Sequence, residues 1–148
     1  MKALPWKTIL GVAAGILAGG LVVGIIEFIS HKMFPLPEGI DTTDMQAVQK
    51  AMLEGKIPTE AIAAVLGAWI VGAFVGAFVA TKVGHWLPGM LVGGLLAFFG
   101  GMMVIMIPHP LWFMMSAALF FPIATIGGVA LGGGFKKKIP VSAPVPRA

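Results

Sequence analysis

Residues 59–81 read TEAIAAVLGAWIVGAFVGAFVAT and decide the fold. No charged residue occurs between Glu60 and Lys82, and the length is close to the ~20 residues that a helix needs to cross a hydrocarbon layer of about 30 Å. Small residues recur in this stretch at a spacing of four: Ala68, Gly72, Gly76 and Ala80. Because such a row lets a second helix approach closely, the stretch predicts a tightly packed transmembrane helix.

Three further stretches have the same apolar character: residues 8–29, 86–107 and 111–132. Only Pro108, His109 and Pro110 separate the last two. A proline disfavours helix in the residue before it and suits the start of a new helix, so we expect a tight helical hairpin here. Rows of small residues recur in these spans as well. The residues that we expect to pack helices together are Gly72, Gly76, Gly93 and Gly101.

The composition supports four spans in a single domain. The chain has 148 residues, of which 58% are hydrophobic and 11% charged, whereas about a quarter of the residues are charged in a typical soluble domain. Between the first two spans lies a loop, residues 30–58. There Asp44 is a candidate N-cap, Gly55 a candidate C-cap, and Met45, Val48 and Met52 share one helical face. We therefore predict an all-α membrane protein with four transmembrane helices in two hairpins and a short amphipathic helix, about residues 44–54.

The distribution of basic residues predicts the orientation in the membrane. Seven lysine and arginine residues lie on one side of the spans: Lys2, Lys7, Lys82, Lys136, Lys137, Lys138 and Arg147. Three lie on the other side, among five acidic residues. Because cytoplasmic segments carry the excess of positive charge, both termini and the basic tail, residues 135–148, should be cytoplasmic. Lys82 and Lys136–Lys138 are then placed to contact anionic lipid headgroups, a more economical explanation of the charge than nucleic-acid binding.

Four polar residues on the opposite, outer side form a candidate site: Glu27, His31, Asp41 and His109. Glu27 and His31 are four residues apart and therefore share a helical face, and His109 should lie at the same membrane depth. Two histidines and a carboxylate could hold a divalent metal, and haem or quinone binding is a related possibility. The alternative is that Glu27, about two residues inside the interface, is satisfied by snorkelling or by a contact with His31 or Lys32.

Trp69 lies about ten residues into its span, near the middle of the bilayer, where its indole N–H needs an acceptor. The candidates in the last span are Ser116, Thr125 and the carbonyl of Ala118, which Pro122 leaves without its helical donor. We expect either packing with these residues or the lining of a ligand cavity.

Several classes of function are disfavoured. The absence of cysteine excludes disulfides and thiolate sites. No ionisable residue lies in the central half of any predicted span, and ion or proton pathways are usually marked by such residues. We therefore favour a non-enzymatic accessory or assembly-forming subunit without a cofactor, whose partners are lipids, further copies of itself or a larger membrane complex. The alternatives are a redox protein that binds metal, haem or quinone through Glu27, His31 and His109, and a small homo-oligomeric channel or transporter.

The run MIPHPLWF at residues 106–113 resembles a signature of small, uncharacterised bacterial membrane proteins with four spans. The loop run FPLP at residues 34–37 and the Ala68-Trp69 pair are similar too. The resemblance implies a multi-pass protein of the bacterial inner membrane and brings no particular activity with it.

Overall fold

The computed structural model describes residues 6–41 and 43–135 and is all-helical over that part of the chain, which confirms the predicted fold class. Four of its helices are long and apolar enough to cross a membrane: α1 (Trp6–Met33), α3 (Thr59–Val83), α4 (Trp86–Met106) and α5 (Leu111–Leu131). The predicted boundaries agree to within two residues except at the end of α1. There the helix continues through one further turn, residues 30–33, beyond the apolar run.

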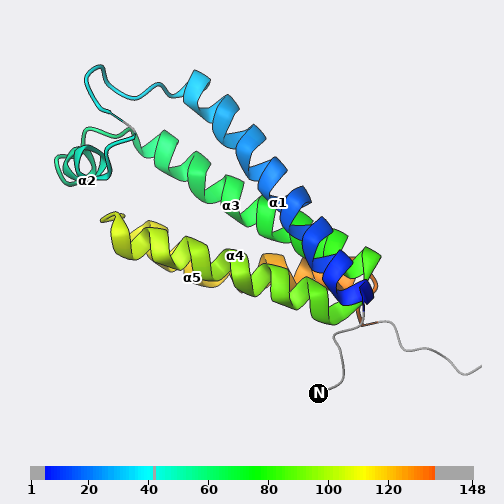
Figure 1. The fold of residues 1–148 in the computed structure, drawn as a ribbon. Coiled ribbons are helices and arrows are strands. Elements are labelled where there is room, and N and C mark those ends of the chain that lie inside the picture. The colour runs from blue at the N-terminus through cyan, green and yellow to red at the C-terminus, as the bar shows by residue number, and fades with distance from the viewer. Residues whose placement is uncertain (1–5, 42, 136–148) are drawn as a thin grey trace, which may run out of the picture.

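The helix α3 occupies the centre of the bundle and packs against α1, α4 and α5, whereas α1 and α5 do not contact each other. Figure 1 shows α1 beside α3, and α4 converging with them at one end and separating toward the other, whereas α5 keeps contact with α3. We call the separated end the α2 end, because the short helix α2 (Met45–Leu53) lies across it. The bundle is therefore a wedge that opens beneath α2.

Small residues set the close contact between α1 and α3. Along this antiparallel pair Gly11, Gly15 and Gly19 lie against Ala80, Gly76 and Gly72, in that order. A Cβ atom added at Gly15 would lie 2.6 Å from the carbonyl oxygen of Gly76, nearer than two non-bonded atoms can come. Glycine at this position is therefore what brings the two backbones into van der Waals contact, as membrane helix association requires.

The helix α4 packs on α1 near the end opposite α2 and departs from it further along. Pro88, Val92 and Leu96 lie close to Gly11, Gly15 and Gly19, respectively. Further along, Gly20 and Val23 of α1 and Phe99 and Gly100 of α4 line a cavity between the two helices. The separation between α1 and α4 is thus confined to the half of the bundle nearer α2.

The caps predicted for α2 are present. The side chain of Asp44 accepts a hydrogen bond from the backbone N–H of Gln46 at 2.9 Å. Gly55 has φ +66°, and Gly55 and Lys56 donate their backbone N–H groups to Met52 and Ala51 at 3.1 and 2.9 Å. This is the Schellman arrangement, in which a left-handed residue closes the helix. The predicted apolar face, which carries Val48 and Met52, lies toward the bundle.

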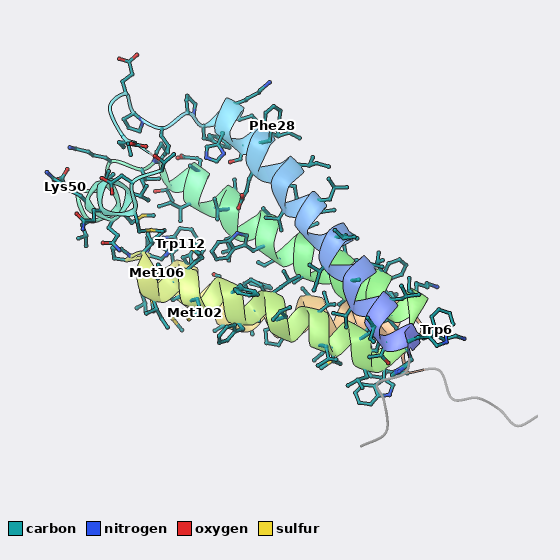
Figure 2. The ribbon with its side chains drawn as sticks, in the orientation of Figure 1. Trp6, Phe28, Lys50, Met102, Met106 and Trp112 are labelled. Carbon is teal, nitrogen blue, oxygen red and sulfur yellow. The ribbon has the colours of Figure 1, made fainter. Side chains whose placement is uncertain are left out.

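One hydrogen bond fixes α2 to the end of α4. The side-chain amide of Gln49 donates to the carbonyl oxygen of Met106 at 2.5 Å. The last carbonyls of a helix have no partner within the helix, so this bond satisfies one of them. Figure 2 shows Met106 and Trp112 at the α2 end, close to α2 with its Lys50, and Trp6 at the opposite end.

Candidate functional site

A cavity of about 170 Å³ lies beneath α2, at the end where α4 separates from α1. Its walls come from α1, α2, α3, the end of α4 and three connecting segments, and most of the lining side chains are aliphatic or aromatic. Besides Trp69, three lining residues have polar side chains: Ser30, His31 and His109. The apolar lining consists of Phe34, Leu36, Val48, Met52, Ile57, Ala61, Ile62, Val65, Trp69, Met103 and Ile107.

The indole N–H of Trp69 donates a hydrogen bond to the Oε1 atom of Glu27 at 3.1 Å. The expected acceptors for this group, Ser116, Thr125 and the carbonyl of Ala118, were therefore wrong. Side chains on a helix lean toward its N-terminus. Because α1 and α3 run in opposite directions, the tryptophan leans toward the α2 end, the glutamate leans away from it, and the two side chains meet.

Glu27 also lies deeper than expected. Gly19 lies against Gly72 and Gly15 against Gly76, and extending this register places Glu27 level with Ala64. That position is roughly 7–8 Å below the start of α3, at about 1.5 Å per residue. The extra turn at the end of α1 has the same effect, since it lengthens the helix beyond Glu27. A partly buried hydrogen bond, rather than a snorkelling side chain, therefore satisfies this carboxylate.

His31 contacts Glu27 through the backbone rather than through the carboxylate. Its Nδ1 atom lies 2.8 Å from the carbonyl oxygen of Glu27, four residues earlier in the same helix. A carbonyl oxygen only accepts hydrogen bonds, so Nδ1 carries the proton. The ring is held against its own helix and borders the cavity.

His109 is fixed in the turn between α4 and α5. Its Nδ1 atom donates to the carbonyl oxygen of Ile107 at 2.8 Å, and its ring stacks on Phe113 at a centroid distance of 4.3 Å. Phe113 is fully buried and makes an edge contact with Trp69 at 5.8 Å. Trp69, Phe113 and His109 therefore form an aromatic floor under the cavity, which the spacing of the sequence did not reveal.

The four predicted site residues do not form one cluster. Glu27, His31 and His109 gather around the cavity and Trp69, whereas Asp41 accepts hydrogen bonds from the backbone N–H and the hydroxyl of Thr43 at 2.8 and 2.7 Å. The hydroxyl donor is the main reason that the pKa of Asp41 lies below its usual value. Within residues 6–41 and 43–135, no three His, Asp or Glu side chains come together in a group able to hold a metal ion.

A second cavity of about 240 Å³ adjoins the first and lies between α1 and α4. The two share Trp69 and Met103. The second is lined by Gly20 and Val23 of α1 and by Leu96, Phe99 and Gly100 of α4, with Phe121 behind. Because Gly20 and Phe99 are exposed on the outside of the bundle, the wedge is open sideways, in the direction from which a lipid would enter.

The predicted packing residues occupy different positions. Gly72 and Gly76 lie between α1 and α3, and Gly93 lies between α4 and α5, where an added Cβ atom would be 2.1 Å from Thr125. Gly101 faces open space, because a row of residues spaced four apart turns gradually around a helix of 3.6 residues per turn and leaves the contact with α5.

At the end opposite α2, the Nζ atom of Lys82 lies 5.5 Å from the ring centroid of Phe78. Residues 136–138, the other predicted headgroup contacts, lie outside the described residues.

The comparisons add no homologue to this picture. No protein-family model, curated protein or solved structure matches the chain.

Proposed function

We propose that this multi-pass membrane protein is a non-enzymatic accessory protein that binds one amphipathic, lipid-soluble molecule in the cavity beneath α2. The observation that carries the proposal is the form of the site: an apolar cavity bordered by two imidazoles, with a sideways opening between α1 and α4. Ligand sites in proteins are commonly apolar hollows with a few polar groups that orient the ligand. Here the tail of the ligand would lie in the wedge and its head beneath α2.

Binding is favoured over catalysis by the hydrogen bonds of the polar groups. Glu27 accepts from Trp69, and each histidine Nδ1 is bonded to a backbone carbonyl. Each of these three side chains is bonded to a carbonyl oxygen or an indole rather than to another of the three, so they do not form the linked nucleophile, base and orienting group that nucleophilic catalysis uses. They make a rigid binding surface, in which orientation and shape determine what is held.

Filling the cavity should remove the ligand. Ala61 lines the cavity, whereas Ala63, two residues away on α3, is exposed on the outside. We expect wild-type protein purified in mild detergent to carry one bound molecule in its native mass spectrum. The Ala61→Trp variant should lose it, because an indole takes up most of the space, and the matched Ala63→Trp variant should keep it. Equal occupancy in all three proteins would contradict the proposal.

We further propose that the membrane is the bacterial inner membrane, with both termini in the cytoplasm and α2 on the outer side. The support is the excess of lysine and arginine on the side of the termini. The native chain has no cysteine, so single cysteines report cleanly. In intact cells, an impermeant maleimide should label Glu38→Cys and leave Ser142→Cys unlabelled until the membrane is opened. The reverse pattern would show the opposite orientation.

A further inference from the structure

The polar groups that border the cavity are acceptors of hydrogen bonds. His31 and His109 each use Nδ1–H to donate to a backbone carbonyl oxygen at 2.8 Å. In a neutral imidazole with the proton on Nδ1, the Nε2 atom carries a lone pair and accepts. In the neutral form of both rings, the two nitrogens left for a ligand are therefore acceptors.

The donor that a tryptophan would supply is already in use. The indole N–H of Trp69 is bonded to Glu27, so Trp69 presents only its ring to the cavity. Ser30 has a hydroxyl group, which can donate or accept, and it adapts to whatever the ligand offers. No lining side chain therefore offers the ligand a free group that can only donate.

The lining also carries no full charge of either sign: no Asp, Glu, Lys or Arg is among its residues. A phosphate head placed there would lose its water without gaining an opposite charge, which is strongly unfavourable, and an ammonium head would find only the Glu27 carboxylate beyond the lining, which is already bonded to Trp69. A neutral hydroxyl loses less and recovers it by donating to an imidazole nitrogen.

We infer that the cavity selects a lipid-soluble alcohol: an uncharged head that donates its hydroxyl proton to the Nε2 atom of His109 or His31, on an apolar tail that leaves through the wedge between α1 and α4. The inference rests on the proposed function and specifies its ligand class. A site that presents unpaired acceptors rejects an analogue without the donor far more strongly than one that differs only in apolar size.

Matched brominated ligands can test this inference. The protein would carry Phe in place of Trp6, Trp86 and Trp112, so that Trp69 is the single fluorophore, and it would be held in phosphatidylcholine nanodiscs. The probes are 11-bromoundecanol, its methyl ether and 11-bromoundecylamine, whose bromine quenches an indole on contact. We expect the alcohol to bind at least tenfold more tightly than the ether, the equivalent of about 1.4 kcal/mol for one hydrogen bond.

Two variants assign the preference to the imidazoles. His109→Phe keeps an aromatic ring to stack on Phe113, and His31→Leu keeps an apolar side chain at the rim. One or both should lower the affinity for the alcohol to that for the ether and leave the ether unchanged. Retained binding of the ether also shows that the cavity is still folded.

The possible outcomes separate the two proposals. Alcohol and ether of equal affinity, both bound more weakly in Ala61→Phe, would overturn the selection of a donor and leave the cavity as a binding site. Tighter binding of the amine than of the alcohol would overturn it in favour of a cation site. Quenching that is absent for all three probes, or unchanged in Ala61→Phe, which fills the cavity without adding a second indole, would contradict the proposed function itself.

Discussion

Replacing Gly15 by leucine should lower the stability of the protein by about 3 kcal/mol, the upper part of the usual range for overpacking. The Cβ atom alone would lie 2.6 Å from the Gly76 carbonyl oxygen and 2.7 Å from the Ala80 side chain. The first of these neighbours is backbone, so relief requires α1 and α3 to separate along their length. For a chain of this size we expect a fall of roughly 10 °C in the unfolding temperature in detergent.

Gly24→Leu is the matched control. It lies nine residues further along α1, and a Cβ atom there meets nothing within 4 Å. Both substitutions gain the same helix propensity, so the difference between them isolates the contact with α3. Equal unfolding temperatures for the two variants would show that α1 does not pack on α3 through Gly15.

The spans could be predicted because each depends on local properties of the sequence. Apolar length determined α3, α4 and α5, the Pro-His-Pro turn separated α4 from α5, and the Asp44 and Gly55 caps located α2. The end of α1 was missed because its last turn lacks the apolar character by which the spans were recognised. Residues 30–33 are polar enough to lie outside an apolar run, but the His31 Nδ1 contact with the Glu27 carbonyl belongs to a helix that continues through them.

The site was only partly predictable. Glu27, His31 and His109 could be placed at one end of the bundle from topology alone. The bond between Glu27 and Trp69 could also have been found, because the small-residue rows of α1 and α3 give the register and opposed helices lean their side chains toward one another. The wedge could not have been predicted, since the separation of α4 from α1 beyond Leu96 depends on how four helices fill space together. The exposure of Gly101 and the burial of Phe113 in the aromatic floor depend on the same packing.

The wedge also gives the bond between Glu27 and Trp69 its importance. A carboxylate and an indole N–H in an apolar cleft each lose hydration, and an unpaired buried polar group costs about 1–3 kcal/mol. Paired, they satisfy each other and hold the indole ring between the two cavities, next to Gly100 of α4. Trp69 thus borders both the place where a head group would lie and the path that its tail would follow.

The central claim is that a single kind of membrane molecule occupies the cavity beneath α2, and photochemical cross-linking tests it most directly. A diazirine side chain of valine size would replace Val65, which lines the cavity, or Ala63, which is exposed two residues away on α3. After illumination in native membranes, the mass of the adduct at each position would be measured. The account predicts one defined adduct at position 65 and a mixture of bulk phospholipids at position 63. The same mixture at both positions, or no adduct at position 65, would contradict it.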